Sequence, residues 1–169
     1  DSERTSQYIL ALEKTSVGVA PFKALSLEDS PARHRRRSEL YTKQNIKEVA
    51  MPPLQRPAVL PARLRIGYFS ADFKKHPVSY LMIKVFETHN RDAFEIFGYS
   101  LGNLVNDDMR ARLVRGFDTF RDVQDLSGRE IALIAQKDRI DVAIDLTGHT
   151  KQGRPTIFSN RAAPIQINY

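Results

Sequence analysis

Residues 64–70 read LRIGYFS, and this short apolar run decides how the rest of the chain is interpreted. A run of this length, with so few polar side chains, is typical of a strand that is buried on both faces. Two further runs have the same character: residues 94–101, FEIFGYSL, and residues 140–146, IDVAIDL. Apolar strands of this kind predict a parallel sheet that helices cover on both sides.

Helical patterns separate the strands. After the first strand, apolar side chains recur at helical spacing at Leu81, Met82, Val85 and Phe86, and after the second at Met109, Leu113, Val114 and Phe117. Residues 127–130, SGRE, form a capping box that opens a helix through residue 135. Short strands are predicted over residues 119–123 and 165–169, and a short helix over residues 156–160. This alternation, with right-handed crossovers, predicts the α/β class and a Rossmann-like, doubly wound parallel sheet.

The residues before position 64 show no strand pattern. One helix is predicted over Thr5 to Lys14, and a second from Pro31, with Asp29-Ser30 as its N-cap, to about Ile46. Four prolines at positions 52, 53, 57 and 61 exclude a helix there and predict an extended linker. We therefore expect a helical lead-in over residues 1–50, a Pro-rich linker over 51–63 and the Rossmann-like domain over 64–169.

Composition narrows the function classes. The 169 residues include no cysteine, which excludes disulfides, thiolate metal sites and cysteine nucleophiles. No apolar run approaches the roughly 20 residues that a spanning helix needs, and the first residues do not form a signal peptide. We expect a cytoplasmic protein without a membrane partner. The first residue is Asp1 rather than Met, which suggests a piece of a longer protein.

The net charge of +6 raises the question of nucleic-acid binding. Most of the excess lies in one cluster, Arg33, Arg35, Arg36 and Arg37, on one predicted helix. Such a cluster is usually a solvated face, and we therefore expect no nucleic-acid partner. The rival hypothesis of nucleic-acid binding through this cluster requires a strongly salt-dependent affinity. His34, within the cluster, and His89 are interpreted as surface residues.

Two loops are the candidate sites, because ligands of open α/β sheets bind beyond the carboxyl ends of the strands. Residues 70–79, SADFKKHPVS, follow the first strand, and residues 147–151, TGHTK, follow the strand that ends at Leu146. Each loop contains a histidine, His76 or His149, which suits proton transfer near neutral pH. The first loop also precedes a helix amino terminus, which favours anionic groups such as phosphate.

Neither loop has a nucleotide fingerprint. The chain lacks G-x-G-x-x-G after its first strand and lacks a P-loop, which disfavours dinucleotide-dependent redox enzymes and P-loop nucleotidases. His76 and His149 have no partner at metal-ligand spacing, so we expect no metal and no bound cofactor.

Three segments resemble the catalytic region of O-linked N-acetylglucosamine transferases and SPINDLY proteins. Residues 65–73 and 76–79, RIGYFSADF and HPVS, are similar to the opening of that region. Residues 145–150, DLTGHT, and 161–167, RAAPIQI, are similar to two later motifs, in the same order and at similar spacing. Residues 19–41 also resemble the helical lead-in of bacterial members, which follows tetratricopeptide repeats.

The resemblance implies a fold and a reaction. Members have two lobes in the GT-B architecture, and the chain would be the amino-terminal lobe without the carboxy-terminal nucleotide-sugar lobe. They transfer a sugar with inversion and without a metal from a nucleotide donor to Ser or Thr of a protein. The implied substrates are UDP-N-acetylglucosamine and an acceptor protein or peptide, the missing lobe is the implied partner, and the fragment alone is expected to be inactive.

Residue roles follow from the same resemblance. His76 and Asp72 are the catalytic candidates, His76 as a base and Asp72 as a base or an orienting residue. Pro77 and Val78 would border the donor sugar, and His149, Thr150 and Lys151 would line the acceptor side. Position 149 is His, as in bacterial and SPINDLY-like members, where animal transferases have Tyr, which leaves O-fucosyl transfer as an alternative.

Several of these residues also have a purely structural interpretation. Asp72 could cap the helix that begins near Pro77 or terminate a strand, and Gly148-His149-Thr150 could only shape a turn. Asp141 and Asp145 are interpreted as strand-end caps. A non-catalytic Rossmann-like module that binds a partner or a nucleotide is the second hypothesis of function. An exposed apolar patch is expected where the missing lobe would dock.

Overall fold

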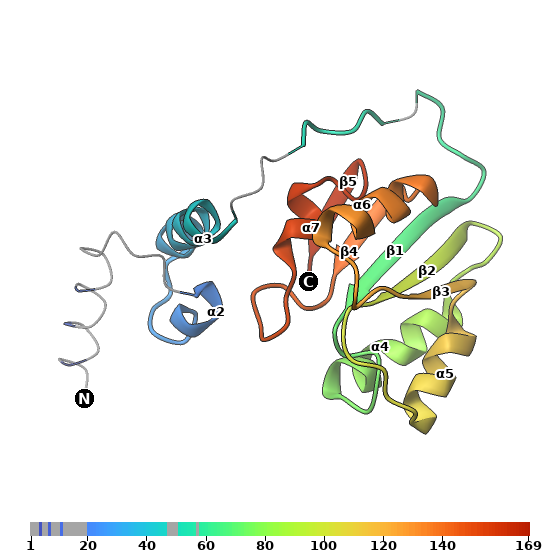
Figure 1. Cartoon of the computed structure of the whole chain (residues 1–169), viewed down its shortest axis with the longest axis horizontal. Coiled ribbons are helices and arrows are strands. Elements are labelled where there is room, and N and C mark those ends of the chain that lie inside the picture. The colour runs from blue at the N-terminus through green and yellow to red at the C-terminus, as the bar shows by residue number, and fades with distance from the viewer. Residues whose placement is uncertain (1–3, 5–6, 8–10, 12–19, 47–50, 57) are drawn as a thin grey trace. The chain divides into compact units, whose positions relative to one another are not determined.

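The computed structural model describes residues 4, 7, 11, 20–46, 51–56 and 58–169. The chain divides into two compact units, residues 1–48 and 49–169 (Figure 1). Of the helix predicted over Thr5 to Lys14, only Gln7 and Ala11 are described, both as helical, and the rest lies outside the described residues. No helix among the described residues is both long enough and apolar enough to cross a membrane.

The first unit contains two described helices, α2 (Pro21–Ala24) and α3 (Pro31–Asn45), each with proline in its first turn. The predicted helix from Pro31 is therefore confirmed, although its N-cap Ser30 makes no side-chain capping hydrogen bond. The prediction that the Arg cluster is a solvated face is wrong for Arg37, which is only 8% exposed. The Glu28 carboxylate pairs with both Arg37 and Arg33, and these ion pairs hold the pKa of Glu28 below its ordinary value against the opposing effect of desolvation.

The second unit is built on a five-stranded parallel sheet of order β3-β2-β1-β4-β5. Its strands are β1 (Leu64–Ser70), β2 (Phe94–Ser100), β3 (Thr119–Asp122), β4 (Val142–Asp145) and β5 (Ile165–Asn168). β1 is central and pairs with β2 along its full length, Leu64 opposite Phe94 and Ser70 opposite Ser100. Each predicted strand is present.

Helices cover both faces of this sheet (Figure 1). They are α4 (Pro77–Thr88), α5 (Asp108–Gly116), α6 (Gly128–Lys137) and α7 (Pro155–Ser159). α4 packs on α5, and α6 packs on α7. The predicted Rossmann-like, doubly wound α/β fold is confirmed.

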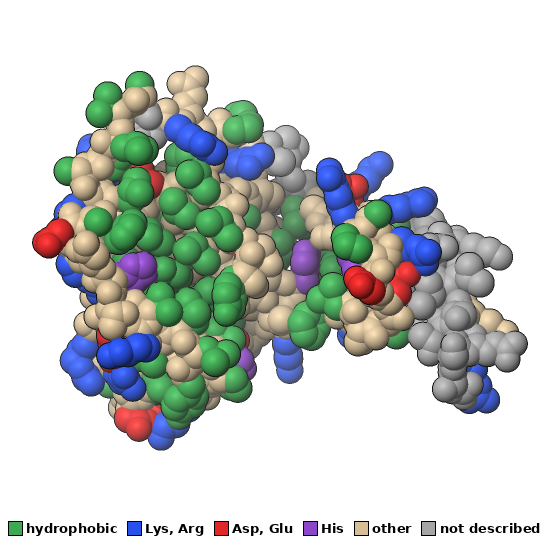
Figure 2. Space-filling model, turned by 180° about the vertical axis from the view of Figure 1, so that it is seen from behind, with side chains coloured by type: hydrophobic (Ala, Val, Ile, Leu, Met, Phe, Trp, Pro, Cys, Tyr) green, Lys and Arg blue, Asp and Glu red, His purple; other side chains and the backbone are tan. Residues whose placement is uncertain are grey.

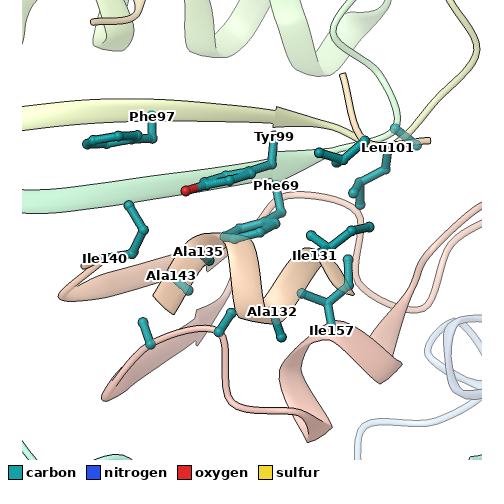
Figure 3. Packing of buried hydrophobic residues seen from close by; sticks show 14 residues of the cluster. Phe69, Phe97, Tyr99, Leu101, Ile131, Ala132, Ala135, Ile140, Ala143 and Ile157 are labelled. Carbon is teal, nitrogen blue, oxygen red and sulfur yellow. The ribbon is translucent and has the colours of Figure 1, made fainter. Parts of the chain in front are cut away.

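Alternation along the strands divides the core into two clusters. Ile66 and Tyr68 of β1 join the cluster beneath α4 and α5, with Phe86 and Leu113. Phe69 of the same strand points to the opposite face and packs among residues of α6 and α7, including Ile131 (Figure 3). There the rings of Phe69 and Tyr99 stack 4.4 Å apart at an interplanar angle of 6°. The period of two in a strand therefore supplies both hydrophobic layers from one apolar run.

Local sequence fixes where the helices begin. The capping box of α6 is present, since the Ser127 hydroxyl accepts from the Glu130 amide and the Glu130 carboxylate accepts from the Ser127 amide. The Asp107 carboxylate caps α5 by accepting from the Arg110 amide at 2.7 Å. α4 begins at Pro77, whose missing N–H costs nothing in a first turn.

The Pro-rich segment has no helix or strand among described residues 51–56 and 58–63. Its first part is attached to the second unit. The Met51 amide donates to the Ser159 carbonyl at 3.0 Å, and the Arg161 guanidinium donates to the Met51 carbonyl at 3.3 Å.

The interpretation of His89 as a surface residue needs correction. It is half-buried, and its Nε2 lies 2.7 Å from the Tyr68 hydroxyl. Burial raises the pKa of Tyr68 to about 12, so the phenol keeps its proton and can donate it. Burial also lowers the pKa of His89, with a further contribution from Arg91. His34 is half-buried too, and its Nε2 lies 2.8 Å from the Glu28 carbonyl oxygen.

Candidate functional site

The strand order places the two candidate loops side by side. From β1 the chain crosses to β2 on one side, and it later returns to β4 on the other side of β1. This reversal is the topological switch point, beyond which open α/β sheets bind their ligands. The Leu146 amide donates to the Phe69 carbonyl at 2.9 Å, and the Ala71 amide donates to the Thr147 hydroxyl at 3.0 Å. The loops after β1 and β4 are therefore joined directly.

Asp72 and His76 face one another within the β1–α4 loop. Oδ2 of Asp72 lies 3.7 Å from Nδ1 of His76, which is an ion-pair distance and longer than a hydrogen bond. The Asp72 side chain is 18% exposed and that of His76 is 39% exposed. On the other side, Nζ of Lys74 lies 3.6 Å from Oδ1 of Asp72. The imidazole is therefore accessible, while the carboxylate beside it is largely shielded.

His76, and not Asp72, is the N-cap of α4. Its Nδ1 accepts from the Val78 amide at 3.4 Å, and Pro77 is the first residue of the helix. The interpretation of Asp72 as the helix cap is therefore wrong. Nδ1 can serve only one neighbour at a time: unprotonated it accepts from Val78, and protonated it faces the Asp72 carboxylate. In the second tautomer Nε2 has a free lone pair.

The backbone around Asp72 is held from within its own loop. The Asp72 amide donates to the Ser70 hydroxyl at 3.0 Å. The Asp72 carbonyl accepts from the Lys74 amide at 2.7 Å and from the hydroxyl of Ser79, a residue that is only 1% exposed. Ser70, Ser79 and Thr147 are the site residues that sequence reasoning missed. Ser70 and Thr147 lie at or just beyond the carboxyl end of a strand and Ser79 lies in a first helical turn, and these positions were the available signal.

The loop after β4 is a tight turn around Asp145. Oδ1 of this buried carboxylate accepts from the amides of Thr147 and Gly148, both at 2.9 Å. Gly148 has φ of 55°, a left-handed conformation that favours glycine. The Thr150 hydroxyl donates to the Thr147 carbonyl at 2.7 Å. The interpretation of Asp145 as a strand-end cap is confirmed, and residues 148–150 do shape a turn.

A cavity of about 230 Å³ opens beside this turn. The residues that line it come from the ends of β4 and β5, the turn and α7: Asp145, Gly148, His149, Pro155, Phe158, Gln166, Ile167 and Asn168. Among the predicted site residues, only His149 belongs to this lining. Thr150 and Lys151 are exposed beside it, and Asp72, His76, Pro77 and Val78 form a separate group at the neighbouring loop.

Other features of the described residues bear on the chemistry. The described residues include no group of three or more His, Asp or Glu side chains that could hold a metal ion.

Hydrophobic side chains also reach the surface of the second unit (Figure 2). On α4 these are Tyr80, Leu81 and Val85, which are 58%, 71% and 42% exposed.

Comparisons with known proteins show the family of this chain. Residues 31–169 match the model of glycosyl transferase family 41. A probable UDP-N-acetylglucosamine–peptide N-acetylglucosaminyltransferase, SEC, from Arabidopsis thaliana is 43% identical over 126 residues, covering 70% of this chain and 13% of the relative. A UDP-N-acetylglucosamine–peptide N-acetylglucosaminyltransferase from Caenorhabditis elegans is 41% identical over 109 residues, covering 62% of this chain and 9% of the relative.

A solved structure is similar as well. A mutant O-GlcNAc transferase from Thermobaculum terrenum superposes with a TM-score of 0.72 at 29% identity, covering 88% of this chain and 32% of that chain. The chain thus spans only a small part of the length of these relatives. The family model nevertheless covers the sheet and both candidate loops, and the chain belongs to glycosyl transferase family 41.

Proposed function

We propose that this chain forms the amino-terminal lobe of a glycosyltransferase that transfers N-acetylglucosamine from UDP-N-acetylglucosamine to Ser or Thr of an acceptor protein. The observation that carries the proposal is the Asp72–His76 pair, with 3.7 Å between Oδ2 and Nδ1, at the topological switch point. Family membership and the names of the relatives supply the reaction class. The acceptor, the donor and the inverting, metal-independent course are parts of the proposal.

The geometry suits a direct displacement. The acceptor hydroxyl oxygen attacks the anomeric carbon from the face opposite the leaving group, forming the new glycosidic bond as the bond to the nucleoside diphosphate breaks. The hydroxyl proton passes to Nε2 of His76. This requires the tautomer in which Nδ1–H faces Asp72, whose negative charge then stabilises the imidazolium that forms.

The neighbouring residues have proposed binding roles. Pro77 and Val78, at the start of α4, border the donor sugar, and the partial positive charge of this helix end favours the donor phosphates. His149, Thr150 and Lys151 line the acceptor side. The remainder of the donor site is proposed to come from a second, carboxy-terminal lobe, which together with the acceptor protein would be the chain's partner.

Donor choice is the open alternative within this proposal. The SPINDLY relatives, such as that of Arabidopsis thaliana at 28% identity, are named for the same activity as the SEC relative. His149 is the residue that the chain shares with SPINDLY-like members, which keeps O-fucosyl transfer from GDP-fucose as the second candidate.

The test is an assay of the full polypeptide that the gene encodes. UDP-N-acetylglucosamine and GDP-fucose are supplied separately, and nucleotide release and the added mass on an acceptor protein are measured. Release with a mass increase from one donor supports the proposal and identifies the sugar. Absence of transfer from both donors, with tight binding of a nucleotide, would instead support the non-catalytic binding module.

His76→Asn tests the proposed base. Asparagine is a good N-cap, so this variant keeps the start of α4 while removing the proton acceptor. We expect kcat to fall by about 10²–10⁴-fold, the usual contribution of a general base, with an unchanged melting temperature. Full activity in this variant would remove His76 from the proposed mechanism.

A further inference from the structure

The segment between β2 and α5 contacts the candidate catalytic loop at several points. The Leu101 amide donates to the Ser70 carbonyl at 2.8 Å. Next in the chain, Gly102 approaches the loop so closely that a Cβ there would lie 2.1 Å from the Ala71 carbonyl oxygen. The backbone of this segment therefore packs directly against the first residue of the loop.

Asp107 holds the far end of the same loop. Its Oδ2 accepts from the Lys75 amide at 2.9 Å, while its Oδ1 accepts from the Arg110 amide at 2.7 Å and caps α5. These two N–H groups hold the pKa of Asp107 below its ordinary value. One carboxylate thus joins the residue before His76 to the start of a helix.

Arg110 holds the middle of the loop. Arg110 is buried, with 9% of the residue exposed, and its guanidinium donates to the carbonyl of Phe73, the residue after Asp72, at 3.3 Å. It also donates to the Ser100 hydroxyl at 3.2 Å and to the Asp122 carboxylate, and it lies 5.1 Å above the Phe120 ring. Because the other contacts fix the guanidinium to the ends of β2 and β3, its position determines where Phe73 lies.

We propose that Asp107 and Arg110, in the first turn of α5, are positioning residues that hold the loop of Asp72 and His76 in the geometry that sugar transfer requires. The inference rests on the proposed function for the reaction, but the contacts themselves do not depend on it. Asp107 fixes Lys75, and Arg110 fixes Phe73, so the two residues hold the loop on either side of Lys74. Displacements of about 1 Å at a reacting group can lower a rate by about 100-fold.

The decisive variant is Asp107→Asn in the full polypeptide. Its side-chain oxygen can still cap α5, but the amide nitrogen that replaces the second oxygen cannot accept from the Lys75 amide. Asp108→Asn is the matched control, because it removes the same charge from the next residue. The Asp108 side chain is 78% exposed, and its ion pair with the Lys75 ammonium group, at 2.7 Å, is a surface pair, which contributes little to stability.

Two measurements are made on each variant. Hydrogen–deuterium exchange followed by mass spectrometry reports on the peptide that contains residues 71–76. Steady-state kinetics with the active donor separates kcat from KM. We expect Asp107→Asn to speed exchange in that peptide and to lower kcat about tenfold or more, with donor KM changed less than about twofold. Asp108→Asn should match the wild type in both measurements.

Several outcomes would overturn the inference. These are unchanged exchange in Asp107→Asn, faster exchange with unchanged kcat, or an equal loss of kcat in Asp108→Asn. Arg110→Lys keeps the charge but loses the planar fork, and it should lower kcat in the same way. If the wild type transfers no sugar from any donor, the proposed function fails, and the exchange measurement alone decides whether Asp107 holds the loop.

Discussion

Single residues in this protein owe their properties to neighbours that are distant in sequence. Arg37 belongs to a run of arginines, yet it is buried, and Glu28, which precedes α3, forms an ion pair with it. Tyr68 is a core residue of β1 whose hydroxyl still needs a partner. His89, at the end of α4, provides that partner at 2.7 Å.

His89 gives the fold a pH dependence of defined sign. Burial, with repulsion from Arg91, lowers the pKa of the folded imidazole from its ordinary value of 6.5. The unfolded chain then binds a proton more readily, so stability is complete above about pH 6.5 and falls as pH falls below this value. Urea unfolding of wild type and His89→Gln at pH 7.5 and 5.5 measures the effect.

Glutamine is the matched replacement, since its amide can bond to the Tyr68 hydroxyl but does not titrate. We expect the free energy of unfolding to fall less between the two pH values in His89→Gln than in wild type. Equal losses would assign the pH dependence to other groups.

At the scale of elements, each helix begins where its sequence directs, and the connections between elements position the site. α6 shows the first point, because its capping box satisfies two backbone amides at its start. α5 shows the second, because its first turn holds the β1–α4 loop through Asp107 and Arg110. The loops after β1 and β4 meet only because those strands are neighbours in the sheet.

Ser127→Ala should destabilise α6. The serine hydroxyl accepts from the Glu130 amide at 3.2 Å, and the loss of such a cap costs about 1 kcal/mol. Glu130→Gln is the control, because glutamine also serves in capping boxes and should have a smaller effect. Chemical denaturation compares the two free energies of unfolding, and a larger loss in Glu130→Gln would contradict this account.

At the scale of the whole molecule, the described site is open and small. Its cavity of about 230 Å³ is below the roughly 300–1,000 Å³ typical of ligand pockets. This cavity includes His149 of the proposed acceptor side but neither Pro77 nor Val78 of the proposed donor side, so it does not enclose a nucleotide sugar. Exposed apolar side chains on α4, Leu81 above all at 71%, add surface that another part of a longer protein could cover.

Residues 1–169 expressed alone are expected to transfer no sugar under conditions in which the full polypeptide is active. The physical reason is the incomplete enclosure of the donor and the need for positive charge around its leaving diphosphate. The same nucleotide-release assay measures both proteins, with circular dichroism as the control for folding. Transfer by residues 1–169 at a comparable rate would show that the described lobe is sufficient.

The sequence by itself determined the class of the fold and the type and order of its elements from Pro31 onward. Periodicity and caps are local properties, so LRIGYFS, the SGRE capping box and Pro77 could be interpreted without knowing their neighbours. Sequence also located both candidate loops, because each follows an apolar strand. The roles assigned to Asp72, His76 and His149 came from resemblance and stay predictions.

Only the tertiary structure decided which groups meet. The Ala71–Thr147 and Lys75–Asp107 hydrogen bonds join residues that are 76 and 32 positions apart. The same holds for the half-burial of His89 against Tyr68. The physical reason is that such contacts depend on strand order and on packing between faces, whereas a sequence pattern reports only the nearest few residues along the chain.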